Sequence, residues 1–168
     1  MRYIFKRKIK KITSNSHIYE FNKSGKVIYC ENLKTKLKVW KEYDERGNII
    51  HIKWNFGYEV WYEYDDKDRI IHDKNTNGRD RRYEYNDLNQ IIHIITTDFE
   101  AWIEYHEIFN EEIHYRQSNG FESWADYNDE GIKVYYKDNT GVEKEYDDSG
   151  MLIMYRNPRG VNIIEDDI

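Results

Sequence analysis

The chain has 168 residues and is unusually polar for an ordered protein: 35% of its residues are charged and 39% are hydrophobic, with 16 Tyr and 5 Trp. This composition is too aromatic for a disordered chain and too polar for a thick two-layer core, and the mean hydropathy is -1.01. No run of 18 apolar residues is present and the N-terminus lacks the apolar segment of a secretory signal. We therefore expect a cytoplasmic protein that does not cross a membrane.

A motif recurs about every 21 residues from the first fifth of the chain to its end. Each copy has an acidic residue, an aromatic anchor, a turn that begins in most copies with Asp or Asn, and a short apolar run that in four copies ends in His. The anchors are Phe21, Tyr43, Tyr64, Tyr85, Tyr105, Tyr127 and Tyr146. A fixed period of this length indicates a repeat fold, so most conspicuous residues are copies of a structural consensus.

In chain order, residues 1–16 read as a basic N-terminal strand or cap, residues 17–160 as the repeats and residues 161–168 as a C-terminal cap, all in one domain spanning 1–168. The copy at 59–73 shows the order of elements expected in each repeat: a half-exposed strand at 59–64, a tight turn at 65–68 and a returning strand from Ile70. A second turn, such as Asn77-Gly78, leads into the next copy. The pattern predicts an all-β protein: an antiparallel meander of about seven β-hairpin repeats. We expect roughly 13 to 15 strands in an elongated, twisted or solenoid-like sheet.

Charge is distributed unevenly along the chain. Residues 1–41 contain 12 Lys/Arg and 2 Asp/Glu, whereas residues 42–168 contain 14 Lys/Arg and 30 Asp/Glu, so the two parts carry +10 and -16 and sum to the net charge of -6. A strongly acidic body favours basic partners, including proteins that handle nucleic acid. The alternative interpretation is that the charges keep an exposed sheet soluble.

The residue before the anchor is acidic in every copy, and a Trp stands two residues earlier in four copies, with Arg82 in its place in the central one. Alternation along a strand places the Trp and the acid on one face and the anchor on the other. Because Trp, Tyr and Arg dominate interface energetics, this acid-tryptophan stripe is the candidate partner-binding surface. Cross-strand packing is the structural alternative. The candidate residues are Trp40, Trp61, Glu63, Arg82, Glu84, Trp102, Glu104, Trp124 and Asp126.

Two patterns resemble metal sites, but we expect neither to bind a metal. His51, His72, His93 and His114 are each 21 residues apart, which in a meander is two strands or about 10 Å, too far to share one ion. The segment 73–84 matches the calcium loop of an EF-hand letter for letter. Strands rather than helices are expected on both sides of it, and three arginines, Arg79, Arg81 and Arg82, oppose a cation. We therefore expect no metal and no cofactor.

No motif for nucleophilic or acid-base catalysis is present, so we do not expect an enzyme. Cys30 is the single cysteine and is interpreted as structural. The basic N-terminus and the arginines beside aromatic residues give some support to nucleic-acid binding. The acidic residues of the repeats would repel phosphates, so nucleic acid is not the expected partner.

The pattern Glu-Tyr-Asp-x-x-Gly, seen at 42–47 and 145–150, resembles the YD or RHS-type repeats of bacterial proteins over roughly residues 17–165. The resemblance implies the architecture of the large members of that group, in which the repeats form a β-sheet spiral that encloses a toxic C-terminal domain. We expect this chain to depart from them, because its residues include no recognisable signal, protease-like plug or toxin domain, and because seven copies are too few to enclose a cargo.

The sequence therefore leads to a non-enzymatic protein-binding module that occludes or neutralises a basic target, such as a toxin-immunity protein or a phage counter-defence, anti-CRISPR-like inhibitor that imitates nucleic-acid charge. The alternative is a carbohydrate- or surface-binding module that uses exposed Trp and Tyr. A third interpretation is a structural unit that pairs through open sheet edges. The expected oligomeric state is a monomer or an edge-paired dimer.

Overall fold

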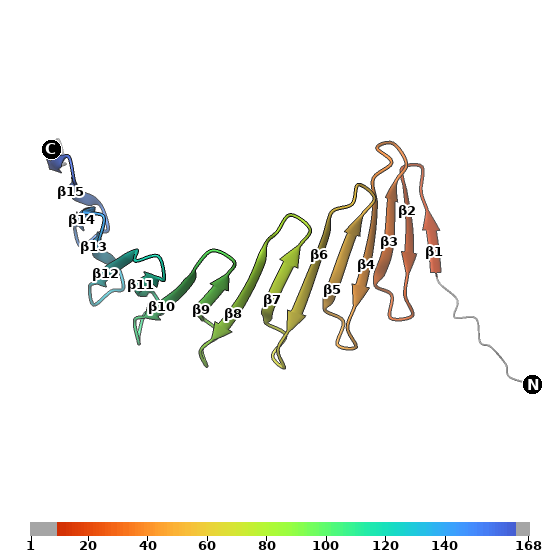
Figure 1. The fold of residues 1–168 in the computed structure, drawn as a ribbon, viewed down its shortest axis with the longest axis horizontal. Helices are drawn as coiled ribbons and strands as arrows, with labels where there is room; N and C mark the ends of the chain where they lie inside the picture. The colour runs from red at the N-terminus through yellow and green to blue at the C-terminus, as the bar shows by residue number, and fades with distance from the viewer. Residues whose placement is uncertain (1–9, 164–168) are drawn as a thin grey trace, which may run out of the picture. The chain divides into compact units, whose positions relative to one another are not determined.

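The computed structural model describes residues 10–163, and these residues form β-strands joined by short turns (Figure 1). The strands are β1 (Lys10–Thr13), β2 (His17–Phe21), β3 (Val27–Asn32), β4 (Lys38–Tyr43), β5 (Ile49–Trp54), β6 (Glu59–Tyr64), β7 (Ile70–Asn75), β8 (Asp80–Tyr85), β9 (Ile91–Thr96), β10 (Glu100–Tyr105), β11 (Glu112–Gln117), β12 (Glu122–Tyr127), β13 (Lys133–Asp138), β14 (Glu143–Tyr146), β15 (Leu152–Asn157) and β16 (Gly160–Ile163).

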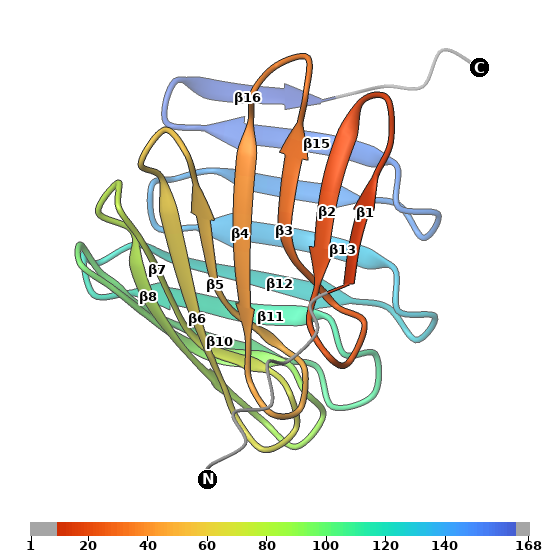
Figure 2. The same cartoon turned by 90° about the vertical axis from the view of Figure 1, so that its right-hand side faces the viewer.

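The strands follow chain order, β1 to β16, in one antiparallel sheet. The expected all-β meander of hairpins is thus confirmed, with sixteen strands within residues 10–163 rather than the roughly 13 to 15 expected. Contacts divide the chain into two units, residues 1–82 and 83–168, and each is described by itself. In Figure 2 the strands of the second unit, coloured green to blue, run side by side.

Parts of the expected terminal caps, residues 1–9 and 164–168, lie outside the described residues. Within residues 10–163 no helix has the length and apolar character that a membrane crossing requires.

In the copies whose first turn begins with Asp or Asn, that residue closes the turn, as the sequence predicts. The Asp44 carboxylate accepts hydrogen bonds from the backbone N–H groups of Gly47 and Asn48, at 2.6 and 2.7 Å. Asn128 does the same for Glu130 and Ile132 at 3.0 and 2.9 Å. An Asx side chain that replaces backbone acceptors in this way fixes the turn and hence the hairpin register. Equivalent turns begin at Asn22, Asp65, Asn86 and Asp147.

The anchor tyrosines tie each copy to the strand before it. The Tyr64 hydroxyl donates to the carbonyl of Ile49 at 2.8 Å, and Tyr105 donates to the carbonyl of Ile91 at 2.9 Å. Tyr43 and Tyr127 make the same bond to residues 16 and 15 positions earlier. The hydroxyl therefore satisfies a carbonyl at the start of the neighbouring return strand, which explains why Tyr rather than Phe recurs at the anchor.

Six of the hairpins that a first turn closes carry a β-bulge just after the acidic residue. In the β6–β7 pair, Glu63 faces His72 but Tyr64 faces Ile70, so that Ile71 has no direct partner. The β4–β5, β10–β11 and β12–β13 pairs shift register at the corresponding place. A bulge increases local twist and redirects side chains, here always next to the acid.

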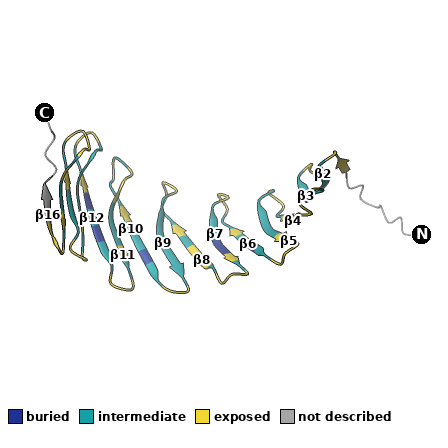
Figure 3. Ribbon diagram, turned by 90° about the horizontal axis from the view of Figure 1, so that it is seen from above, coloured by how far each residue is buried: buried dark blue, intermediate teal, exposed yellow. Residues whose placement is uncertain are grey.

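The interior of each unit is thin. The buried hydrophobic residues among those described are Val60, Ala101 and Ala125, and no large side chain is fully buried. Buried positions lie near the middle of strands β6, β7, β10 and β12, where Figure 3 shows dark blue on β7, β10 and β12. Stability must therefore come mainly from backbone ladders and cross-strand side-chain pairs rather than from a deep core.

Candidate functional site: an acid-histidine-tryptophan face

On one face of the first unit, His51 lies between two carboxylates and against a Trp ring. Its Nε2 is 2.8 Å from Glu59 and its Nδ1 is 3.5 Å from Glu42. The ring stacks on Trp61 with centroids 5.0 Å apart and an interplanar angle of 7°. The register explains the cluster, because Glu42 and Trp61 both pair directly with His51 across β4, β5 and β6.

The cluster around His72 is the most buried of these in the first unit. Its Nδ1 lies 3.0 Å from Glu63 and its Nε2 lies 2.8 Å from Asp80, while its own side chain is 7% exposed. A neutral imidazole has a single N–H donor, so both contacts are satisfied only by the protonated ring. Arg82, which replaces the Trp of other copies, pairs directly with His72.

The pKa values of this cluster follow from its geometry. Burial alone would lower the pKa of His72, but the hydrogen bonds and charges of Glu63 and Asp80 outweigh burial and leave the pKa above its ordinary value. The hydrogen bond from His72 lowers the pKa of Glu63. Both shifts favour the charged pair.

The second unit repeats the arrangement around His93. Its Nδ1 lies 3.3 Å from Glu84 and its Nε2 lies 3.5 Å from Glu100, and its ring stacks on Trp102 with centroids 5.1 Å apart.

His114 forms the next cluster of that unit. It lies between Glu104 at 3.4 Å and Glu122 at 4.0 Å and stacks on Trp124 with centroids 5.3 Å apart. Each unit thus carries, on successive hairpins, a histidine that lies between two carboxylates.

A cation covers the other side of each of these stacked indoles. Lys74 lies over Trp61, with its Nζ 5.8 Å from the ring centroid, and Arg116 lies over Trp102 at 4.7 Å. Lys137 lies over Trp124 at 5.3 Å. Because both faces of the indole are occupied, the part left for a partner is the ring edge.

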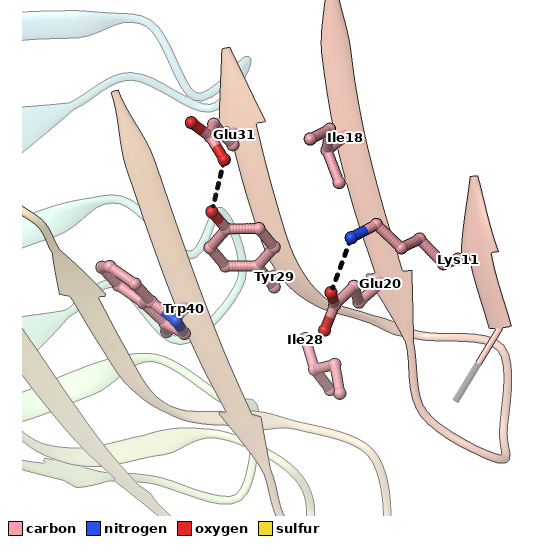
Figure 4. A pocket seen from close by; sticks show the side chains of 7 residues that line it. All are labelled: Lys11, Ile18, Glu20, Ile28, Tyr29, Glu31 and Trp40. Carbon is pink, nitrogen blue, oxygen red and sulfur yellow. Dashed lines mark hydrogen bonds and ion pairs between the residues drawn. The ribbon is translucent and has the colours of Figure 1, made fainter. Parts of the chain in front are cut away.

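The first unit also has an open recess of about 400 Å³ at its N-terminal strands (Figure 4). Trp40 forms one side of it, is 38% exposed and tilts against Tyr29 with centroids 5.4 Å apart. Lys11 pairs with Glu20 at 3.6 Å on the opposite side, as Figure 4 shows. The remaining lining residues are Ile18, Ile28, Tyr29 and Glu31.

A recess of about 570 Å³ in the second unit is built from equivalent positions of the repeat. Its lining includes the acid Glu104, the bulged Ile113, His114 and Trp124, which correspond to Glu20, Ile28, Tyr29 and Trp40. The bulge next to the acid therefore opens a hollow at the same place in two different copies, once in each unit.

The candidate residues fall into these clusters. In the first unit Trp61 contacts His51, Glu63 and Arg82 flank His72, and Trp40 borders the recess. In the second unit Glu84 and Trp102 flank His93, Glu104 and Trp124 flank His114, and Asp126 lines the recess there.

Sequence reasoning missed half of the carboxylates and treated the histidines separately from the stripe. Glu59, Asp80, Glu100 and Glu122 complete the clusters from the other side of the ring. The signal was present, because each stands two residues before the Trp or Arg position. The exposed side-chain fractions of the histidines are only 7% to 23%, because the stacked indole or the paired Arg covers them.

The segment that resembles a calcium loop forms a hairpin. Strands β7 and β8, not helices, flank its turn, as expected. Asp73, the first position of the pattern, is 5% exposed and lies 2.5 Å from Arg79 and 3.6 Å from Arg81. Glu84, the twelfth position, contacts His93 instead. Within the described part of the chain, no group of three or more His, Cys, Asp or Glu side chains is arranged so that it could hold a metal ion.

Comparison with solved structures identifies a similar fold in toxin-complex proteins. The crystal structure of TcdB2-TccC3-TEV matches with a TM-score of 0.67 at 11% identity, covering 86% of this chain and 9% of that one. The TcdB2-TccC3-Cdc42 structure matches with a TM-score of 0.66 at 12% identity and the same coverage. The structure of TcdB2-TccC3 without its hypervariable C-terminal region gives a TM-score of 0.67 at 11% identity.

The chain thus spans about a tenth of the length of these structures, 9% in each case. The likeness shows the fold, a β-repeat consistent with the YD/RHS-type pattern. No protein-family model matches the sequence, and no curated protein matches it.

Proposed function

We propose that this chain is a non-enzymatic protein-binding module of the YD/RHS-repeat type that engages a basic target protein through the acid-histidine-tryptophan face. The roles that fit are toxin immunity and phage counter-defence, in which an acidic protein occludes the basic surface of a nucleic-acid-handling target.

One observation carries the proposal: the carboxylates before the anchors remain exposed although they contact histidine. The exposed side-chain fractions of Glu42 and Glu63 are 68% and 61% in the first unit, and those of Glu84 and Glu104 are 64% and 68% in the second. Their oxygens are held in place by the histidine and still have free lone pairs for a partner's Lys or Arg. Neighbouring copies present these oxygens about 10 Å apart.

The test is the affinity of the partner recovered with the immobilised chain and identified by mass spectrometry. We expect the triple variant E63K/E84K/E104K to weaken binding by more than about tenfold, and added salt to weaken binding to the wild type.

The matched control is E45K/D66K/D98K, which makes the same change in net charge at exposed turn residues away from the face. We expect it to retain most of the affinity. Equal losses in both triple variants, or binding that is insensitive to salt, would exclude the proposed face.

The carbohydrate-binding alternative is favoured by one feature, the exposed Trp40 beside the recess of Figure 4. At Trp61, Trp102 and Trp124 stacking on a sugar is disfavoured because His and a cation already occupy both faces of the ring. Glycan-array binding that is lost in Trp40→Ala would support this alternative, and an array without signal would exclude it.

A further inference from the structure

One edge of the second unit differs from the corresponding edge of the first. The edge consists of the turns that follow the anchors, at 86–90, 106–111, 128–132 and 147–151, and we call it the acidic turn edge. These turns contain seven Asp/Glu and no Lys/Arg. The equivalent turns of the first unit, at 22–26, 44–48 and 65–69, contain five Asp/Glu and five Lys/Arg. Six carboxylates of the acidic turn edge are exposed: Asp87, Glu107, Glu111, Asp129, Glu130 and Asp148.

Two large aliphatic side chains stand at the tips of neighbouring turns on this edge. Leu88 is 62% exposed and Ile108 is 76% exposed. The third turn position that they occupy is taken by Arg46 and Lys67 in the first unit. An exposed Leu or Ile gains nothing from folding, so two in succession at positions that are otherwise polar indicate a surface that a partner covers.

The extra residue in the turn at 106–111 explains the exposure of Ile108. Phe109 folds inward and stacks on His106 with centroids 4.7 Å apart. It also lies against the next turn, where a Cβ on Gly131 would come within 2.9 Å of its ring. With Phe109 serving as the inward anchor of the turn, Ile108 points into solvent.

The two tips are held in a fixed relation to each other. The Gln90 side-chain amide donates to the carbonyl of Asn110 at 3.1 Å, which links the turn of Leu88 to that of Ile108. Asn86 closes the first of these turns by accepting from the backbone N–H groups of Leu88 and Gln90, both at 3.0 Å. The tips are therefore a preorganised pair rather than two independent side chains.

The exposed acids of the face continue into this edge. Glu84 and Glu104 stand two residues before the turns that carry Leu88 and Ile108. The apolar tips thus have carboxylates along the turns and on the adjoining face. An apolar centre with a charged rim is the usual anatomy of an interface hot spot.

We infer that the acidic turn edge is the docking surface for a basic amphipathic helix of a partner protein, with Leu88 and Ile108 inserted between its apolar side chains. This inference rests on the proposed function, because it takes the target to be basic. Turns two strands apart are separated by about 10 Å, and seven residues of a helix rise about 10.5 Å. A helix that lies along the row of turns therefore repeats the same arrangement of apolar side chains at the spacing of Leu88 and Ile108, so that each can insert between apolar side chains of the helix. Its flanking Lys and Arg residues meet Asp87, Glu107 and Asp129.

A second copy of this chain is a poorer occupant of the same edge. Two such edges brought together would oppose six exposed carboxylates with six others, and the turns supply no Lys or Arg to offset them. A dimer detected by sedimentation that dissociates in L88S/I108S would contradict the inference.

The direct test uses two fluorescein-labelled peptides of about 18 residues, composed only of Leu and Lys. One has helical periodicity and the other has the same composition in an order without it. Fluorescence anisotropy with the full chain should show the periodic peptide binding at least about tenfold more tightly. In L88S/I108S we expect that affinity to fall by about tenfold or more, with the circular dichroism spectrum unchanged.

The matched control is F56S, because Phe56 is 68% exposed at a turn of the other type in the first unit. Its affinity for the periodic peptide should stay within about twofold of the wild type. Absence of peptide binding, equal binding of both peptides, or an unchanged affinity in L88S/I108S would overturn the inference. If the peptides bind equally and E63K/E84K/E104K abolishes binding of both, the proposed function stands and the helix site fails. If E63K/E84K/E104K leaves the affinity for the natural partner unchanged, the proposed function fails.

Discussion

Trp61 and His51 stack face to face, with ring centroids 5.0 Å apart and planes 7° from parallel, and Lys74 covers the other side of the indole. The stack lies across two neighbouring strands, so it stabilises the sheet. It also fixes the imidazole, which in turn orients the carboxylates of Glu42 and Glu59 that contact it. Under the proposed function, recognition and stability are therefore coupled through one side-chain cluster.

The stack predicts a measurable coupling between its two rings. In a double-mutant cycle of His51→Ala and Trp61→Ala, we expect a coupling free energy of about 1 kcal/mol, because stacked aromatic pairs contribute this much beyond the area they bury. Urea denaturation of the two single variants and the double variant gives the value. Additive losses would mean that the rings lie together without stabilising each other.

His72 should make stability depend on pH. Its folded-state pKa is raised, so its contribution is complete below the unfolded pKa of about 6.5 and disappears as pH rises through the folded-state pKa. The lowered pKa of Glu63 keeps that partner charged until the pH falls well into the acid range. The loss of unfolding free energy in His72→Gln should therefore be larger at pH 5.5 than at pH 8.5.

Tyr64→Phe is the control for that comparison, because its phenol has a pKa raised by burial and is uncharged at both pH values. A difference between His72→Gln and the wild type that does not change with pH would show that folding does not shift the pKa of His72, and a smaller loss at pH 5.5 than at pH 8.5 would show that the folded protein holds the ring neutral.

The anchor hydroxyl should have its own effect on stability. Removing the bond from Tyr64 to the carbonyl of Ile49 in Tyr64→Phe should cost about 1 kcal/mol. Tyr64→Leu, which also removes the ring, should cost clearly more. Equal stability of Tyr64→Phe and the wild type, measured by chemical denaturation, would show that water replaces the phenol.

Alanine substitutions at two glycines should distinguish the cost of backbone strain from the cost of a packing clash. Gly25 and Gly131 have the same φ of +79°, but a Cβ meets nothing within 4 Å at Gly25 and meets the Phe109 ring at 2.9 Å at Gly131. Gly25→Ala should cost about 1 kcal/mol for the left-handed conformation alone. Gly131→Ala should cost more, because Phe109 must move. Losses of equal size would mean that the ring shifts freely and that Phe109 does not hold Ile108 outward.

Much of the fold can be predicted from the sequence because each hairpin is determined by residues that are close together in the chain. The Asp44 turn, the alternation around Trp61 and the spacing of the tyrosine anchors each determine a hairpin through contacts within one or two strands. The side-chain clusters did not follow, because they depend on the bulge that skips Ile71 and aligns Glu63 with His72. Register at a bulge is decided by cross-strand packing, which no single strand encodes.

The exposed tips were harder to anticipate for a different reason. The sequence shows an extra residue after Tyr105 but not which of Ile108 and Phe109 turns inward. Phe109 is the residue that turns inward, because its ring packs in the space that the missing side chain of Gly131 leaves free. Gly131 belongs to the following copy, so the sequence of the turn itself does not reveal this.

The contacts found between strands of the described residues join neighbours in the chain. Each junction therefore depends on two adjacent hairpins alone, and a duplication or deletion of one whole copy would leave every remaining junction chemically unchanged. Such a chain can alter its length during evolution in steps of about 21 residues without inventing a new core. New specificity then needs to arise only in the turn of a single copy, while its neighbours keep the sheet intact.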